Sequence, residues 1–227
     1  MALQYSHSLP DFVCTEVIER SSGSANTRQP LMRPLNDTLT VKLSYFDRKE
    51  DHKLVLIDGR KADRTFDSLG GAIGMGEFGG MLDGIFELSS ATTFKWESSR
   101  TTRGHRVAVY SYAIRQDHSS YLLSSGAPGA TQQAVVAFHG SLEIDMQSAS
   151  VLRFTYEADR IPKDVILTYA LSTVDYDFAK VGGREYLLPS TSETEMHTDK
   201  IWLRNHIVFR DYNKYATDST ITFEPPK

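Results

Sequence analysis

Short segments in which every second residue is apolar recur along the chain, and they constrain its fold more than any other feature. The clearest is segment 37–47, DTLTVKLSYFD. A period of two places its apolar side chains on one face of a β-strand and its polar side chains on the other. Patterns with the 3.6-residue period of a helix are confined to a single segment. We therefore predict a mainly β protein.

Turn-forming dipeptides between these segments predict how the strands pair. Asp-Gly at 58–59 and Gly-Gly at 182–183 accept the positive φ angles that two-residue hairpin turns require. A third turn at 199–200 would give the last hairpin one charged face and one apolar face. Its charged pairs would be Glu193 with His206 and Glu195 with Arg204, and its apolar face would carry Met196, Leu203, Ile207 and Phe209. A slip by one residue would turn those four side chains to water, which supports this register.

Composition excludes several classes of protein. The chain has 25 Lys and Arg against 29 Asp and Glu, which argues against a nucleic-acid partner because phosphate binding needs a basic face. Cys14 is the only cysteine, so neither an internal disulfide nor a thiolate zinc site is expected. No apolar run approaches the length of a transmembrane segment. The first residues lack the basic start and apolar run of a signal peptide, so none is expected in this chain.

A single domain is expected over residues 1–227. Segments 21–34 and 124–132 are rich in Ser, Gly, Pro and Ala, and we predict that both are loops. The strand-like segments on either side of each loop are similar in spacing and composition. Neither loop is therefore expected to separate two domains.

The glycine-rich segment 66–87 is the one exception to the β pattern. Its apolar residues recur at helical spacing from Glu77 onward. A glycine inside a helix costs up to about 1 kcal/mol relative to alanine, so Gly79, Gly80 and Gly84 make an isolated helix weak. We predict that this helix packs against a curved sheet. It would be either a plug that fills the core or a lid over a ligand cavity.

Within that segment, residues 74–79 match the letters G-x-G-x-x-G of a dinucleotide site. Such a site needs a preceding parallel strand and a following helix in a βαβ unit, so that the pyrophosphate meets the helix N-terminus. Here the surrounding pattern is one of antiparallel hairpins. We therefore reject a dinucleotide site and predict no cofactor.

Two polar clusters invite a metal or catalytic interpretation. They are Glu193, Glu195 and His197 in one segment, and His139, Glu143 and Asp145 in another. Along a strand, the outer two members of the first cluster would be about 13 Å apart, which is too far for ligands of one ion, so no metal site is predicted. The second cluster could form a hydrolytic site only if its side chains met in a cleft. The common nucleophile, zinc, phosphate and redox motifs are absent, and no catalytic residue is predicted.

Several motifs read together resemble a bacterial family of exported proteins of uncharacterised function. They are LPDFVC at 9–14, LSYFD at 43–47, the glycine pairs of 70–71 and 76–79, GHRV at 104–107, TVDY at 173–176 and YLLP at 186–189. The resemblance extends from about Leu9 to Thr222. It implies an extracytoplasmic location, most specifically the periplasm.

The chain also has an order of strands, a helical lid segment and a meander that includes residues 104–110, 144–145 and 151–153. In this order it is distantly similar to the lipoprotein-carrier (LolA-like) superfamily. This resemblance implies an incomplete antiparallel β-barrel, a curved sheet wrapped around one or two short helices. It also implies an apolar cavity for acyl chains, and hence a lipid or lipoprotein ligand.

The leading functional hypothesis is a non-enzymatic, extracytoplasmic domain that binds a hydrophobic or lipid-like ligand on the concave face of the sheet. The ligand would contact Met75, Phe78, Met81, Leu82, Ile85 and Phe86. Burial would contribute about 25 cal/mol per Å² of apolar surface, and methionine adapts to irregular shapes. One alternative is a structural or protein-interaction module of the cell envelope with a filled core and no ligand. A second alternative is a hydrolase-type enzyme with a polar cleft.

Overall fold

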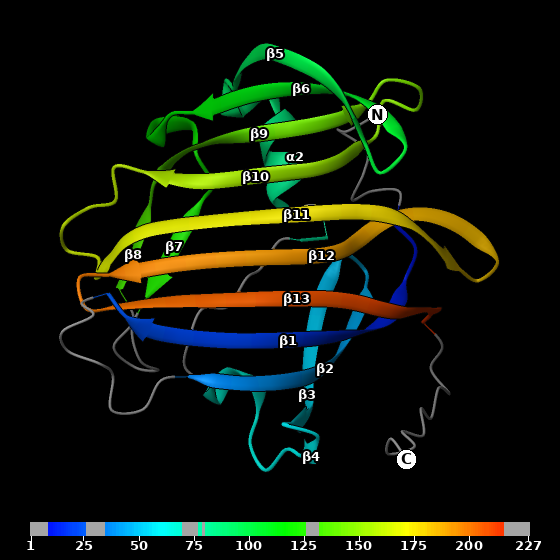
Figure 1. Cartoon of the computed structure of the whole chain (residues 1–227), viewed down its shortest axis with the longest axis vertical. Helices are drawn as coiled ribbons and strands as arrows, with labels where there is room; N and C mark the ends of the chain where they lie inside the picture. Colours follow the sequence, from blue (N-terminus) through cyan, green and yellow to red (C-terminus); the bar gives the residue numbers. More distant parts are fainter. Residues whose placement is uncertain (1–8, 26–34, 70–76, 79, 126–131, 216–227) are drawn as a thin grey trace.

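An arched β-sheet dominates the computed structural model, which describes residues 9–25, 35–69, 77–78, 80–125 and 132–215 (Figure 1). The strands of the described residues are β1 (Phe12–Ser24), β2 (Asn36–Phe46), β3 (Lys49–Ile57), β4 (Arg60–Lys61), β5 (Thr93–Thr102), β6 (His105–Ile114), β7 (Leu122–Ser125), β8 (Gln132–Val135), β9 (Ala137–Asp145), β10 (Val151–Asp159), β11 (Leu167–Val181), β12 (Arg184–Thr198) and β13 (Ile201–Lys214). The described residues also form the α-helix α2 (Gly80–Phe86) and the 3-10 turns η2 (Phe66–Ser68), η3 (Leu88–Ser90) and η4 (Gln116–His118). None of these helices is long and apolar enough to cross a membrane. The chain is mainly β, as predicted.

The strands form one large sheet and one small one. Eleven of them are antiparallel neighbours in the order β4-β3-β2-β1-β13-β12-β11-β10-β9-β6-β5, and β7 pairs with β8. The first long strand, β1, pairs with the last one, β13, in the middle of the large sheet. Within the described residues the edge strands β4 and β5 do not pair with each other, so the sheet is not closed. The predicted incomplete antiparallel barrel is therefore confirmed.

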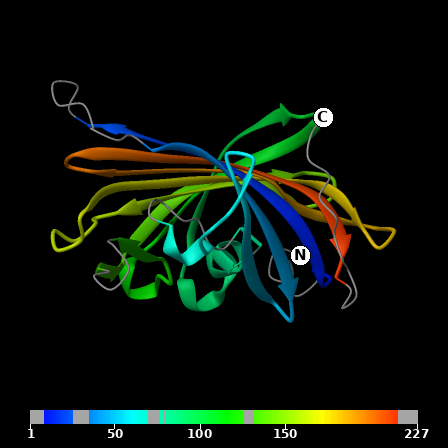
Figure 2. The same cartoon turned by 90° about the horizontal axis from the view of Figure 1, so that it is seen from below.

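The large sheet is bent into an arch, and the helical segments and the β7–β8 hairpin lie beneath it (Figure 2). Leu82 of α2 and Leu123 of β7 belong to the same buried cluster as Phe138 of β9. Side chains alternate along a strand, so Phe138 and Leu142 of β9 face the arch interior, whereas His139 and Ser141 face outward. The concave face of the sheet is therefore the core of the protein.

Two apolar clusters share this concave face. The α2 cluster consists of the buried residues Leu82, Ile85, Tyr112, Ile114, Tyr121, Leu123, Val136, Phe138, Leu142, Val151, Phe154, Tyr156, Val165, Leu167, Ala170, Val174 and Tyr176. The Phe78 cluster consists of Phe12, Cys14, Ile18, Leu39, Val41, Leu43, Tyr45, Leu54, Leu69, Phe78, Val181, Leu188, Ile207 and Phe209. The first cluster lies under the β6–β11 half of the sheet, and the second lies mainly under β1, β2 and β13.

The hairpin turns have the backbone conformations that the sequence predicts. Asp58 and Gly59 both have positive φ, 49° and 74°, and Gly182 and Gly183 have φ of 58° and 84°. In the last hairpin Glu193 pairs with His206 and Glu195 with Arg204, which confirms the predicted register. The predicted apolar face is also turned to the core, and it carries three buried polar residues as well: Ser192, Thr194 and Asn205.

Part of each predicted loop is strand. β1 continues through Ser21 to Ser24, where it pairs with β13. A Cβ atom on Gly23 would lie 2.5 Å from the ring of Trp202, so glycine at this position makes room for the indole. Ser124 and Ser125 belong to β7, and Gln132, which pairs with Ser125, begins β8. Residues 26–34 and 126–131 lie outside the described residues.

Candidate functional site

Most of the predicted ligand-contacting residues lie at the interface between α2 and the concave face. Phe78, Leu82 and Ile85 are buried, with exposures of 2%, 1% and 0%. Met81 and Phe86 are partly buried and pack against the α2 cluster. The helix begins at Gly80, three residues later than the apolar pattern predicts. Met75 lies outside the described residues.

Contacts of two kinds hold this cover, which we define as Glu77, Phe78 and α2, against the sheet. The Phe78 ring lies 5.2 Å from the Phe12 ring and 5.4 Å from the Phe209 ring, measured between centroids. The Tyr176 hydroxyl donates a hydrogen bond of 2.7 Å to the Glu77 carbonyl oxygen. Burying a side chain the size of leucine or phenylalanine contributes about 1.5–3 kcal/mol. Apolar packing therefore contributes the larger share of the docking energy.

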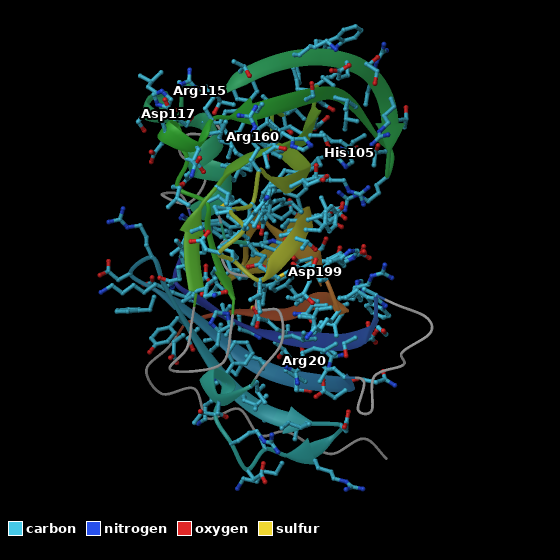
Figure 3. The ribbon with its side chains drawn as sticks, turned by 90° about the vertical axis from the view of Figure 1, so that its left-hand side faces the viewer. Arg20, His105, Arg115, Asp117, Arg160 and Asp199 are labelled. Atoms are coloured by element: carbon cyan, nitrogen blue, oxygen red, sulfur yellow. The ribbon has the colours of Figure 1, made fainter. Side chains whose placement is uncertain are left out.

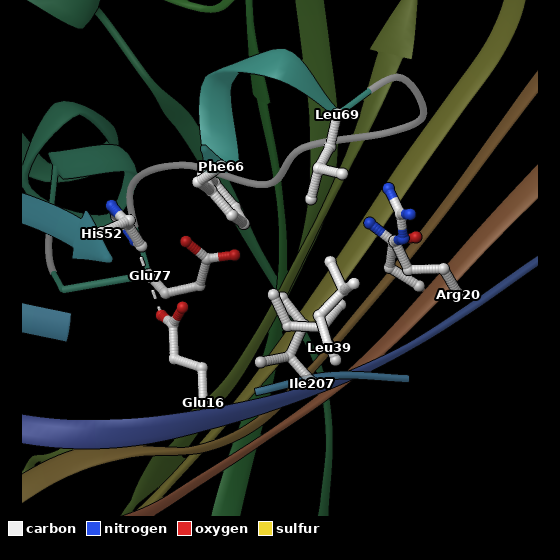
Figure 4. A pocket seen from close by; sticks show the side chains of 10 residues that line it. Glu16, Arg20, Leu39, His52, Phe66, Leu69, Glu77 and Ile207 are labelled. Carbon is white, nitrogen blue, oxygen red and sulfur yellow. Dashed lines mark ion pairs between the residues drawn. The ribbon is translucent and has the colours of Figure 1, made fainter. Parts of the chain in front are cut away.

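Beside the Phe78 cluster, the concave face holds a pocket with polar walls. Residues from β1, β2, β3, β13 and η2 line it together with Glu77 of the cover. Glu16, His52 and Glu77 gather at one end, and Arg20 lies at the other (Figure 4). The free space is about 20 Å³, roughly what one water molecule needs. The side chains that line the pocket therefore fill most of it.

The acidic end of the pocket is buried. The Glu16 and Glu77 side chains are almost inaccessible to solvent, and the Nε2 atom of His52 lies 3.6 Å from Oε1 of Glu16. The His52 ring stacks on Phe66 with a centroid distance of 5.4 Å. The Ser192 hydroxyl donates a hydrogen bond of 3.3 Å to Oε1 of Glu77. The cover and the sheet therefore meet through titratable groups as well as apolar ones.

These surroundings change the pKa of each of three groups. Burial first, and then the charge of Glu16, raise the pKa of Glu77 to about 7. Burial is also the main reason that the pKa of Glu50 is raised. Burial lowers the pKa of His52, but the hydrogen bond and charge of Glu16, with the charges of Glu50 and Glu77, more than offset it and leave that pKa raised. The site therefore binds protons more tightly than the same groups in water.

At the other end of the pocket, Arg20 makes two hydrogen bonds to the Asp37 carboxylate, of 2.8 and 2.6 Å. Arg20 and Leu69 also line an adjoining, more open groove of about 400 Å³. Leu35, Ile57 and Leu203 contribute apolar surface to that groove. Leu69 belongs to the Phe78 cluster, so the groove adjoins that cluster.

A strip of exposed apolar side chains borders the opposite end of the cover. Phe94 and Trp96 on the edge strand β5 are 46% and 59% exposed, and Leu88 of η3 is 96% exposed. The Phe86 ring of α2 stacks on Phe94 at 5.6 Å. We call Phe86, Leu88, Phe94 and Trp96 the β5 rim. Figure 3 shows Arg115 and Asp117 at this end of the arch and Arg20 in its other half.

The polar clusters singled out in the sequence lie on the outer face and have separate partners. His139 lies 3.1 Å from Asp159, Glu143 pairs with Arg100, and Asp145 accepts a hydrogen bond from Ser148. Glu195 bonds to His197 and Arg204, and Glu193 lies 3.4 Å from His206. Within the described residues no group of His, Cys, Asp and Glu is arranged to hold a metal ion. The hydrolase alternative requires that His139, Glu143 and Asp145 meet in a cleft, and they do not.

Sequence reasoning missed the acidic end of the pocket, although β1 carries a signal for it. Phe12, Cys14 and Ile18 occupy the inward positions of β1, and Glu16 and Arg20 occupy the same face. A charged side chain on the same buried face of a strand as apolar side chains needs a buried partner. The partners, on β2, β3 and the cover, are distant in sequence, so the pattern of β1 alone does not identify them.

No protein-family model and no curated protein matches this sequence. Several solved structures are distantly similar to it. One is a DUF1329 family protein from Desulfovibrio piger, with 6% identity, a TM-score of 0.40 and coverage of 96% of this chain and 90% of that one. Another is a LolA superfamily protein from Nitrosomonas europaea, with 7% identity, a TM-score of 0.35 and coverage of 95% and 90%.

A third match is a domain from Vibrio parahaemolyticus that is described as that of an outer membrane lipoprotein-sorting protein. It has 11% identity, a TM-score of 0.34 and coverage of 91% of this chain and 87% of that one. All three similarities are distant, with identities of 6–11% and TM-scores of 0.34–0.40. What the chain binds has to be argued from its own residues.

Proposed function

We propose that this chain is a non-enzymatic binding domain that holds a hydrophobic or lipid-like ligand on the concave face of its sheet. The ligand would displace the cover from that face. One observation carries the proposal. An apolar, arched surface is covered by a helix of only seven residues that includes Gly80 and Gly84 and docks through Phe78, Leu82 and Ile85.

Such a cover is weak by itself. Helices shorter than about 12 residues are marginal in water, and glycine lowers their stability further. Apolar contacts are not directional, so an acyl chain can replace the contacts that Leu82 and Ile85 make with the sheet. The ligand would then occupy the α2 cluster, and Phe78, Met81, Leu82, Ile85 and Phe86 would close over it.

The β5 rim supports a route of entry. Its exposed aromatic and aliphatic side chains continue the apolar stripe of α2 through the stacked rings of Phe86 and Phe94. Exposed apolar patches on soluble proteins often mark binding surfaces. We propose that the ligand enters here, and that in an extracytoplasmic compartment such as the periplasm it is a lipid or the acyl chains of a lipoprotein.

A second candidate is a structural or interaction module of the cell envelope with a filled core. Complete burial of Leu82 and Ile85 favours it, as does the small free space in the polar pocket. The two candidates differ in whether the cover is ever displaced.

Binding of dansyl-labelled undecanoic acid, followed by fluorescence and native mass spectrometry, distinguishes these candidates. We expect one bound probe per chain. Met81→Gln should weaken binding several-fold, because Met81 packs at the proposed contact surface and a buried amide there is unfavourable. Met146→Gln is the matched control, since Met146 is 57% exposed in the turn after β9. Absence of binding to the unmodified chain would support the filled core instead.

A further inference from the structure

We propose that the protonation state of the buried carboxylates beneath the cover controls its release: the cover stays docked at acidic pH and is released more readily at neutral and alkaline pH. Release of the cover does not require a ligand and can be measured on the chain by itself. Its role as a control on ligand entry rests on the function proposed above.

The geometry places one carboxylate of the cover against others of the sheet. Glu77 is 5% exposed and comes directly before Phe78, the residue that anchors the cover in the Phe78 cluster. Its side chain lies at the same end of the pocket as Glu16 (Figure 4). The titratable groups facing it are Glu16 of β1, Glu50 and His52 of β3, Tyr156 of β10 and Tyr176 of β11.

The charges around Glu77 are unbalanced. Two of the groups that face it are carboxylates, and one imidazole, His52, is placed to offset them. Arg20, at the far end of the pocket, holds Asp37 through two hydrogen bonds. An ionised Glu77 would therefore add negative charge to a buried site that already contains it, which is unfavourable unless a proton is bound.

The direction of the pH effect follows from the difference between the docked and released states. When docked, Glu77 has a pKa raised to about 7, whereas in water its ordinary value is 4.5. Between these values the docked state holds a proton that the released state has lost. Each pH unit in this range therefore favours release by up to about tenfold, and the full difference amounts to on the order of a hundredfold.

His52 acts in the same direction. Its pKa is raised in the docked state, because the neighbouring carboxylates more than offset the effect of burial. As the pH rises through that value, His52 loses the positive charge that offsets Glu16 and Glu77. Docking is therefore strongest below about pH 4.5 and weakens as the pH rises to about 7, where Glu77 loses its proton. It weakens further as His52 loses its proton.

Hydrogen–deuterium exchange of the whole chain without ligand tests this inference. After correction for the intrinsic exchange rate, the protection of a peptide spanning 77–86 should fall by on the order of a hundredfold between about pH 4.5 and pH 7.5. Peptides from the β11–β12 hairpin should keep their protection. Glu77→Gln keeps the size of the side chain and removes its charge, so most of this fall in protection of 77–86 should disappear and only the smaller contribution of His52 should remain.

Glu87→Gln is the matched control, because Glu87 is exposed at the end of the same helix and should leave the pH response unchanged. Glu16→Gln should shift the response to lower pH and provides the test if Glu77→Gln does not fold. Protection of 77–86 that is constant with pH in the unmodified chain would overturn the inference, as would an unaltered response in Glu77→Gln. Both outcomes leave binding of the dansyl probe free to succeed, so failure of this inference is distinguishable from failure of the proposed function.

Discussion

The two halves of the concave face are buried to the same degree but are stabilised differently. The α2 cluster consists of aliphatic and aromatic side chains, and its polar atoms are mainly tyrosine hydroxyls. The Phe78 cluster borders the buried charged residues Glu16, Arg20 and Glu77. Apolar packing stabilises the first half, whereas the stability of the second half also depends on charge. The cover spans both halves, so it combines a replaceable apolar contact with a titratable one.

The largest effect should appear when two leucines of the α2 cluster are compared. Leu142 of β9 and Leu82 of α2 are both fully buried in it. Leu142→Ala should lower the free energy of unfolding by about 2–5 kcal/mol, because the sheet cannot collapse around the cavity. Leu82→Ala should lower it by less than about 2 kcal/mol, since the cover can separate while the sheet stays folded.

Urea denaturation followed by circular dichroism measures both variants. Equal losses would mean that α2 unfolds together with the sheet, which is what a fixed plug would do. That outcome would remove the contrast between the replaceable cover and the permanent sheet.

A smaller effect is expected from the charged half. Asp37→Asn should lower the free energy of unfolding by about 1.5–3 kcal/mol, because it weakens two hydrogen bonds to the buried Arg20 guanidinium. Glu97→Gln is the control: its partner Lys95 is largely exposed, and the change should stay within about 0.5 kcal/mol. If both changes had the same effect, buried charge would not be what distinguishes the Phe78 half.

The sequence predicted the parts of this fold that depend on local pattern. The register of the last hairpin could be predicted because Glu193 and Glu195 on one face and Ile207 and Phe209 on the other admit only one alignment. The extension of β1 to Ser24 could not, because Ser-Gly-Ser has the composition of a loop. In the structure this segment pairs with β13, a strand distant in sequence, and Trp202 lies across from Gly23.

The candidate site was predictable in its apolar part alone. The helical spacing of Phe78, Leu82 and Ile85 identified the residues that dock. The acidic end of the pocket joins Glu16, His52 and Glu77, which come from three segments distant in sequence. No periodicity connects such residues, and their shared burial becomes visible only when the sheet and the cover are placed together.

The proposed function requires that α2 leave the concave face before a ligand can bind there. A Cβ atom on Gly84 would lie 3.2 Å from Oγ of Ser120, so Gly84→Cys together with Ser120→Cys should form a disulfide that ties α2 in place. Gly84→Cys alone, treated with the same oxidant, controls for reaction with Cys14. We predict that the oxidised double variant binds dansyl-labelled undecanoic acid at least about tenfold more weakly than its reduced form. Equal affinity in the two forms would contradict the account.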